Sequence, residues 1–223
     1  MIRAAGLSVF FGRTVALDAL DLTIEEGVTG LFGPNGSGKS TLLRVACGLL
    51  RPSRGSLTYD ATPARAADEA FRRRVGYAGH ASGLYARLTL AENLGLLARL
   101  YGVSPARVEE VIAQTSLEGH SRRPVGDLST GLKRRAAVAR ALLHEPDLLL
   151  LDEPYANLDK DAAALVSDAI RAWRGAGRTA IVATHGAKEL KRWADAGVVL
   201  RQGRVVVAGR YGGAARAASE ARR

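Results

Sequence analysis

The chain has 223 residues and carries 32 basic against 22 acidic side chains, a formal net charge of +10 at pH 7. Hydrophobic residues make up 47% of it and charged residues 24%, which excludes an intrinsically disordered chain and allows one domain with a substantial core. Cys47 is the single cysteine, so an internal disulfide is excluded, and no apolar run approaches the length of a membrane span.

The first third of the chain is predicted to form strands and one helix. Strands are expected over residues 2–10, 20–24, 28–32 and 56–59. A helix is expected to follow the third of these strands and to run to about Leu50, before a turn at residues 51–55. Residues 61–74 are rich in alanine, arginine and acids and are expected to form a surface helix or loop. Residues 74–78 are predicted to form a core strand.

The middle of the chain has a helical pattern from Leu88 to about Leu143. Four leucines with helical spacing are expected on one face of the first helix: Leu90, Leu94, Leu97 and Leu100. Apolar residues at 108, 111 and 112 mark a second helix. A third is predicted over residues 132–143, beginning after Gly131.

Strands and helices alternate again in the last third. Residues 148–151 are four leucines followed by two acids, which predicts a strand buried on both faces. Expected after it are a helix at 159–173, a strand at 179–183, a helix at 187–193, and a hairpin of strands at 198–201 and 205–208. A basic tail rich in alanine and arginine occupies residues 211–223, with a short exposed helix expected from Ala214.

The element order predicts an α/β fold in one domain over residues 1–210. We expect a mixed or parallel sheet with flanking helices, an N-terminal antiparallel β part, and a helical subdomain inserted at about residues 85–145. The functional residues should lie near the carboxyl ends of the strands.

Residues 33–41 read Gly-Pro-Asn-Gly-Ser-Gly-Lys-Ser-Thr, which is the spacing of a phosphate-binding loop between a strand and a helix. Glycines let successive backbone N–H groups turn onto phosphates, Lys39 reaches the outer phosphates, and the Ser40 hydroxyl can bind Mg²⁺. The predicted nucleotide-binding residues here are Gly33, Asn35, Gly36, Ser37, Gly38, Lys39, Ser40 and Thr41.

Polar residues at strand and helix ends supply the remaining candidates. Asp152 ends the leucine strand, where its carboxylate can hold the water shell of a metal, and Glu153 is placed to orient or deprotonate an attacking water. His185 follows the next strand; it either contacts a terminal phosphate or the attacking water, or is an ordinary surface residue. Ser129, at a predicted helix start, either binds an anion or only caps the helix.

In order and spacing, the chain resembles the ATP-binding subunits of ABC transporters over about residues 2–210. The resemblance rests on the phosphate loop, Leu-Ser-Thr-Gly at 128–131, Leu-Leu-Leu-Leu-Asp-Glu-Pro at 148–154, Leu-Asp at 158–159, and His185. It implies ATP and Mg²⁺ as cofactors and ATP hydrolysis as the activity. It further implies a head-to-tail homodimer, in which each ATP lies between the phosphate loop of one chain and Ser129 and Gly131 of the other.

The resemblance also assigns roles within the site. It implies Glu153 as general base, Ser40 and Asp152 as magnesium-associated residues, and His185 as a switch on the γ-phosphate. Asp159 and His80 join the nucleotide-binding set by the same resemblance.

One aromatic residue is expected to stack on adenine. Phe11 resembles the aromatic residue that has this role in the family. Phe10 is the alternative, and its alternation with Val9 favours a core position for it.

Two parts of the sequence depart from the family pattern. In the signature segment Thr130 and Leu132 replace a glycine and a glutamine, and His80 stands where a glutamine commonly links the metal site to the membrane partner. Gly-His at 79–80, with Leu-Thr-Leu-Ala-Glu-Asn-Leu at 88–94, resembles the CcmA-type ATPases of the cytochrome c maturation haem exporter. Small drug, lipid or polysaccharide exporters share much of this pattern.

The implied partners are a second copy of the chain and an integral membrane permease. An apolar groove around residues 84–101 would receive a cytoplasmic helix of that permease. The chain lacks the layout of a signal peptide, so we expect it to be soluble and to sit peripherally on the cytoplasmic face of the cell membrane.

The net charge of +10 suits an anionic membrane surface or a polyanion, or it reflects a composition rich in arginine and alanine without a partner. The net charge therefore leaves an alternative function, that of a soluble ABC-type ATPase that acts on nucleic acid. We expect no nucleic acid, because the basic clusters at 72–74 and 133–135 are not interleaved with aromatics and no long coiled coil or second such domain is present. A guanine-specifying Asn-Lys-x-Asp motif and an arginine-rich lid are also missing from the sequence, which disfavours a GTPase or a small-molecule kinase.

Overall fold

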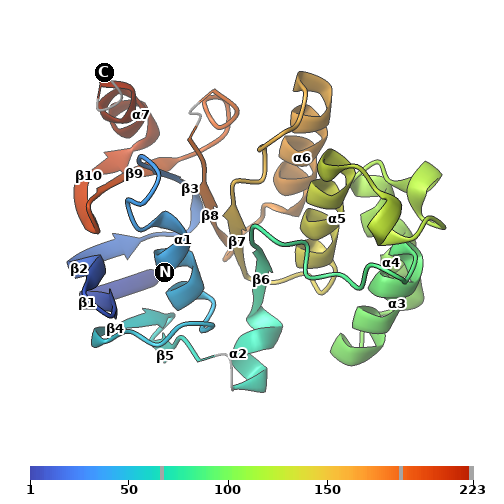
Figure 1. Ribbon diagram of the computed structural model, residues 1–223, viewed down its shortest axis with the longest axis horizontal. Coiled ribbons are helices and arrows are strands. Elements are labelled where there is room, and N and C mark those ends of the chain that lie inside the picture. Colours follow the sequence, from blue (N-terminus) through green and yellow to red (C-terminus); the bar gives the residue numbers. More distant parts are fainter. Residues whose placement is uncertain (66–67, 186–187, 221–223) are drawn as a thin grey trace.

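A computed structural model describes residues 1–65, 68–185 and 188–220 (Figure 1). In this part of the chain the N-terminal strands form an antiparallel sheet in the order β2-β1-β4-β5. Its members are β1 (Ile2–Phe11), β2 (Thr14–Ile24), β4 (Arg54–Tyr59) and β5 (Thr62–Pro63).

A second, six-stranded sheet has the order β10-β9-β3-β8-β7-β6. Its members are β3 (Gly27–Phe32), β6 (Val75–Ala78), β7 (Leu148–Asp152), β8 (Thr179–Ala183), β9 (Ala196–Arg201) and β10 (Arg204–Arg210). All neighbouring pairs are parallel except β10 and β9. The carboxyl ends of β3, β7 and β8 therefore meet at one edge, with Ala183 paired to both Leu31 and Asp152.

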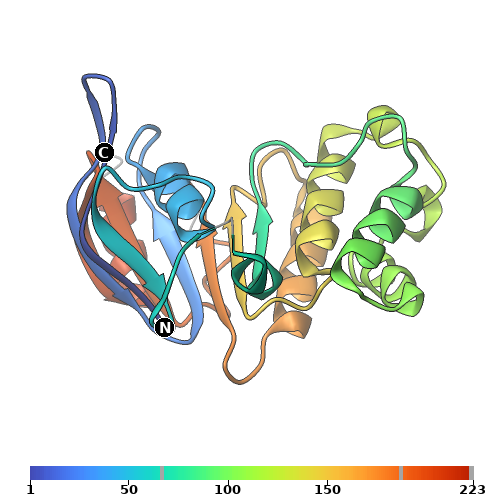
Figure 2. The ribbon, with the colours of Figure 1, turned by 90° about the horizontal axis from the view of Figure 1, so that it is seen from below.

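Helices cover both faces of this sheet and extend beyond one end of it (Figures 1 and 2). They are α1 (Lys39–Ala46), α2 (Glu69–Arg74), α3 (Leu90–Tyr101), α4 (Pro105–Gln114), α5 (Thr130–Leu142), α6 (Lys160–Trp173) and α7 (Tyr211–Glu220), with short 3₁₀ turns at Glu118–His120 and Val125–Asp127. Helix α1 packs between the two sheets, whereas α5, α6 and α7 pack on the opposite face of the larger one. Helices α3 and α4 lie beyond β6, at the end remote from β10 (Figure 2).

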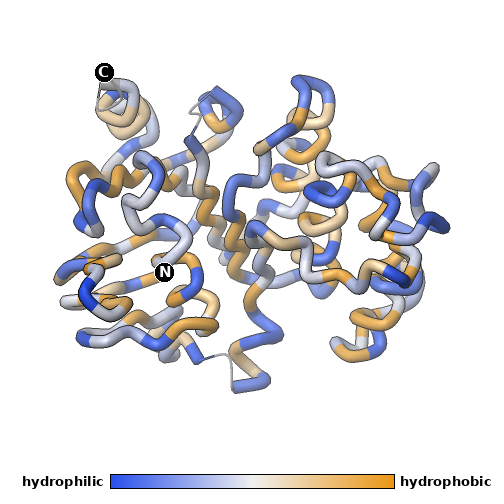
Figure 3. Tube along the Cα trace, viewed as in Figure 1, coloured by the Kyte–Doolittle hydropathy of each residue, from blue (hydrophilic) through white to orange (hydrophobic). Residues whose placement is uncertain are grey.

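The four leucines of β7 divide the core between these two layers. Leu148 and Leu150 face the cluster that contains α1, and Leu149 and Leu151 face the cluster that contains α5 and α6. All four are fully buried, so the prediction of a strand buried on both faces is confirmed. Burial of each leucine side chain contributes roughly 1.5–3 kcal/mol, and the hydrophobic centre of the sheet is visible in Figure 3.

The bounds of α1 and β2 differ from the predicted ones, because the backbone changes direction at positions that the hydrophobic pattern does not mark. Helix α1 ends at Ala46 rather than near Leu50, because Gly48 takes a left-handed φ of 76° just after it. Strand β2 begins at Thr14 rather than at residue 20. Its pairing with β1 shifts register more than once, and Ala19 has a φ of 41°, so its alternation is hidden in the sequence.

Several further predictions about helices are wrong. Helix α7 begins at Tyr211 rather than at Ala214, and both residues are buried, so the tail helix is not simply exposed. Leu90 and Leu94 are buried, but Leu100 is 67% exposed and does not share their face. Residues 188–193 form turns rather than a helix, and Ala187 lies outside the described residues. Helix α5 begins at Thr130, one residue before Gly131, because the Ser129 side chain caps it. Within the described residues, none of the helices combines the length and hydropathy that a bilayer crossing requires.

Candidate functional site

The loop between β3 and α1 has the backbone geometry of a phosphate cradle. Gly33 has a φ of 149°, and a Cβ on it would lie 2.3 Å from the Leu200 carbonyl oxygen. Gly38 has a φ of 104°, and a Cβ on it would lie 2.7 Å from the Ala16 carbonyl oxygen. Only glycine fits such positions. The first N–H groups of α1 have no side-chain cap at Gly38, so they are available to an anion.

Lys39 lies inside this loop. It is 6% exposed, and its Nζ donates to the carbonyl oxygens of Gly33 at 2.7 Å and Pro34 at 3.1 Å. The loop therefore curls around the ammonium group and holds a positive charge at the N-terminus of α1. Both features favour a phosphate group in the cradle.

A cleft of about 580 Å³ opens over the phosphate loop. It gathers predicted residues from five separate parts of the chain. Those lining it are Phe11, Asn35, Gly36, Ser37, Gly38, Lys39, Ser40, Thr41, His80, Asp152, Glu153 and His185. Gly33 shapes the loop without lining the cleft, and Ser129, Gly131 and Asp159 do not line it.

Glu153 and His185 form a pair at the edge where β7 and β8 end. The Nε2 atom of His185 lies 3.1 Å from Oε1 of Glu153, and the backbone N–H of His185 donates to Oε2 at 3.2 Å. Glu153 has a φ of 53°, and its own N–H donates to the Ala183 carbonyl oxygen at 2.8 Å. Burial raises the pKa of Glu153 above its ordinary value, and the charges of His185 and Lys39 oppose that rise. A carboxylate with a raised pKa beside an imidazole is suited to accept a proton from water.

Ser129, Gly131 and Asp159 lie together on another surface of the chain. The Ser129 hydroxyl caps α5 by accepting from Leu132 N at 3.3 Å, and the Asp159 carboxylate caps α6 by accepting from Ala162 N at 2.8 Å. A Cβ on Gly131 would lie 3.2 Å from Leu158, just before Asp159, so the two helix starts are neighbours. Both caps are exposed. A single chain therefore does not bring these residues to its own phosphate loop.

The two phenylalanines at the end of β1 behave differently. Phe11 is 50% exposed and lines the cleft. Phe10 is 37% exposed, and the Arg54 guanidinium lies 5.7 Å from its ring centre, so the expectation that Phe10 is a core residue is wrong. A register shift between Val9 and Phe10 interrupts the alternation on which that expectation rested.

The cleft also contains residues that the sequence pattern did not single out. Val15 is 49% exposed and lines the cleft with Phe11, from the next strand. Arg44 lines it from α1, four residues after Ser40, and this helical spacing would have placed it on the same face. No comparable signal in the sequence marks Val15.

The donors available to a metal are few. The buried Asp152 carboxylate and the exposed Ser40 hydroxyl both line the cleft. Across residues 1–65, 68–185 and 188–220, no group of three or more His, Cys, Asp or Glu side chains could hold a metal ion by itself. One carboxylate and one hydroxyl suit Mg²⁺, which takes oxygen ligands and usually completes its shell with water and substrate phosphates.

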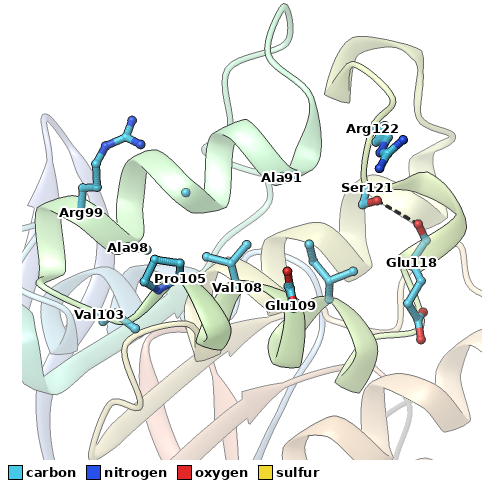
Figure 4. Close-up of a pocket in the computed structure, with 12 residues that line it drawn as sticks. Ala91, Ala98, Arg99, Val103, Pro105, Val108, Glu109, Glu118, Ser121 and Arg122 are labelled. Carbon is cyan, nitrogen blue, oxygen red and sulfur yellow. Dashed lines mark hydrogen bonds between the residues drawn. The ribbon is translucent and has the colours of Figure 1, made fainter.

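A second hollow of about 550 Å³ lies between α3 and α4 (Figure 4). Ala98, Val103 and Val108 contribute apolar lining, and charged side chains such as Arg99 and Glu109 also line it. None of the predicted nucleotide-site residues belongs to it, so the cleft above the phosphate loop is the candidate site.

Comparison with known proteins agrees with this geometry. The family model described as "ABC transporter" matches residues 17–156. A Nod factor export ATP-binding protein I from Rhizobium sp. (strain N33) is 36% identical over 213 residues, covering 93% of this chain and 70% of that protein. The cytochrome c biogenesis ATP-binding export protein CcmA of Cupriavidus necator is 40% identical over 198 residues, covering 86% and 87%. Among solved structures, the ATP-binding cassette MJ0796, a dimer in a post-hydrolysis state with ADP and Pi, has a TM-score of 0.85 and 26% identity over 95% of this chain and 99% of that one.

Proposed function

Because the chain belongs to the ABC transporter family, as an ATP-binding subunit that hydrolyses ATP, we propose that it powers the haem exporter of cytochrome c biogenesis. Two observations support this cargo. The CcmA relative matches over nearly its whole length, and Gly79-His80 resembles the corresponding position of CcmA-type ATPases. The identity to the Nod factor export protein favours a second candidate function, the ATPase subunit of another small exporter of a drug, lipid or polysaccharide.

The phosphate cradle carries the nucleotide-binding part of the proposal. Backbone N–H groups from Gly36 to Thr41 would bind the phosphates together with Lys39, and Phe11 would stack on the adenine. Ser40 and Asp152 would hold Mg²⁺, which offsets phosphate charge when bound.

Hydrolysis is assigned to the pair at the ends of β7 and β8. Glu153 would accept the proton of the attacking water at its buried carboxylate. His185 would orient that carboxylate through the contacts of 3.1 and 3.2 Å and face the terminal phosphate. His80 also lines the cleft, and it would transmit the presence of nucleotide in the site to the loop that follows His80.

The position of Ser129, Gly131 and Asp159 supports a head-to-tail homodimer. Ser129 and Asp159 are exposed and Gly131 is half-buried, and all three lie at helix starts outside the cleft of their own chain. In the proposed dimer, the N-terminus of α5 from one chain closes the cleft of the other, with Ser129 and Gly131 against the ATP phosphates. Each site is then complete only when two chains meet.

A groove between α3 and the segment that follows α1 supports an integral membrane permease as partner. It has a volume of about 170 Å³ and differs from the predicted groove, because only Leu97 and Tyr101 come from residues 84–101 and the segment after α1 and helix α5 also line it. Its lining residues are Cys47, Leu49, Arg72, Val75, Tyr77, Leu97, Tyr101, Arg140, Ala141 and His144. We assign the chain to the cytoplasmic face of the membrane through this contact, with no nucleic acid as partner.

Deletion of the gene in its host, followed by haem staining of c-type cytochromes, tests the cargo. The haem assignment predicts loss of these cytochromes and their return with the wild-type gene but not with Glu153→Gln. Normal levels in the deletion strain would refute haem export and leave the ATPase assignment standing. Permease subunits that never co-purify with the chain, together with ATPase activity indifferent to membranes, would refute the transporter role.

A further inference from the structure

Arg134 connects helix α5 to the backbone of the candidate site. Arg134 is 6% exposed. Its Nη1 atom donates to the Gly79 carbonyl oxygen at 3.0 Å and makes a longer contact of 3.5 Å with the Asp152 carbonyl oxygen. Gly79 precedes His80, and Asp152 precedes Glu153. One guanidinium therefore contacts the backbone beside two residues of the cleft.

The charge of Arg134 is buried without a carboxylate beside it. None of the ion pairs in the described part of the chain includes this residue. A buried cation is costly unless its partners are well placed, and a charged donor binds carbonyl oxygens more strongly than a neutral one. The contact with Gly79 is therefore a strong constraint on the loop that carries His80.

The same helix begins at the residues proposed to meet the nucleotide of the partner. Ser129 caps α5, and Arg134 follows five residues later, about 7.5 Å along the helix axis. Arg134 also lines a hollow of about 220 Å³ with Thr130 from the first turn of α5 and with His80, which in turn lines the nucleotide cleft. About one and a half helical turns and the Arg134 side chain thus join the start of α5 at Ser129 to the backbone of the site at Gly79.

We propose that Arg134 is a positioning residue that couples the two nucleotide sites of the dimer. Engagement of Ser129 and Gly131 by the nucleotide of the partner chain moves α5, and Arg134 transfers that movement to the backbone at Gly79 and Asp152 of its own site. The coupling rests on the proposed function, since it requires two chains that share their sites. Hydrolysis in each chain then depends on occupancy of the other site.

Arg135 provides a matched control on the same helix. Its Nη1 donates to the carbonyl oxygens of Thr115 at 3.2 Å and Ser116 at 3.0 Å, after α4, and neither residue lines the cleft. Arg135→Met thus removes the same guanidinium contacts with backbone carbonyls as Arg134→Met, but away from the site. Arg134→Lys keeps the charge and can donate to one carbonyl.

The experiment measures ATP hydrolysis against ATP concentration for these variants, with binding of a non-hydrolysable ATP analogue and the melting temperature measured on the same samples. The wild-type chain should show a Hill coefficient above 1, with a ceiling of 2 for two sites. Arg134→Met should lower kcat on the order of 10- to 100-fold and bring the Hill coefficient to 1. Its affinity for the analogue should not change, because the phosphate loop is intact. Arg134→Lys should recover part of both losses, and Arg135→Met should keep the kcat and Hill coefficient of the wild type.

Equal kcat values and Hill coefficients for Arg134→Met and Arg135→Met would overturn this inference and leave the proposed function standing. A lowered kcat with an unchanged Hill coefficient would also overturn it, because the residue would then act only within its own site. If Arg134→Met does not fold, Arg134→Lys decides: a Hill coefficient below the wild-type value with unchanged affinity for the analogue supports the coupling, and a wild-type Hill coefficient refutes it. A wild-type chain that hydrolyses no ATP would refute the proposed function and the inference together.

Discussion

Replacement of Glu153 by glutamine separates nucleotide binding from hydrolysis. The side chain is 20% exposed, and the amide oxygen of glutamine can still accept from the His185 N–H at 3.2 Å, so the fold and the phosphate loop should be preserved. The amide cannot take a proton from water. A positioned general base contributes about two to four powers of ten in rate, which corresponds to roughly 3–5 kcal/mol of activation free energy at about 1.4 kcal/mol per tenfold change.

Phosphate release at saturating ATP measures this loss, and a binding titration with ATP shows whether affinity is kept. Glu109→Gln, an exposed glutamate on α4, is the matched control and should hydrolyse ATP at the wild-type rate. Turnover by Glu153→Gln within about tenfold of the wild type would refute the assignment of the base. An equal loss in Glu109→Gln would also refute it, because the effect would then not be specific to the cleft.

Three further predictions concern the cleft. Lys39→Ala should weaken ATP binding itself, because it removes the ammonium that the loop encloses, and unchanged affinity in a titration would contradict the phosphate-loop role. Phe11→Ala should raise the KM for ATP, since base–aromatic stacking contributes about 1–3 kcal/mol, whereas Phe10→Ala should leave KM unchanged. Burial raises the pKa of Glu153, and the charge of His185 opposes that rise. His185→Ala should therefore raise the pKa of Glu153 further and move the acid limb of the kcat–pH profile to higher pH. An acid limb that stays in place or moves to lower pH would contradict the pairing of Glu153 with His185.

Local chemistry explains which parts of the fold were predictable. The leucines of β7 and the glycines of the phosphate loop were recognisable because full burial and close backbone approach each restrict the residue type. The start of β2 was not, because register shifts against β1 interrupt its alternation. The exposed position of Phe10 has the same cause.

The candidate site shows a similar division. Residues whose chemistry dictates their type, such as Lys39 and Glu153, could be selected from spacing alone. Arg134 was visible only as part of a basic cluster, because its role depends on a carbonyl 55 positions away in the chain. Val15 carries no chemical signal, since its place in the cleft follows from the pairing of β1 with β2.

The proposal that two chains share each ATP is tested most directly by the mass of the particle in solution. Small-angle scattering of Glu153→Gln should report the 23.6 kDa of a single chain without nucleotide and twice that mass at saturating ATP. A particle that binds ATP and keeps the mass of one chain would contradict the shared site.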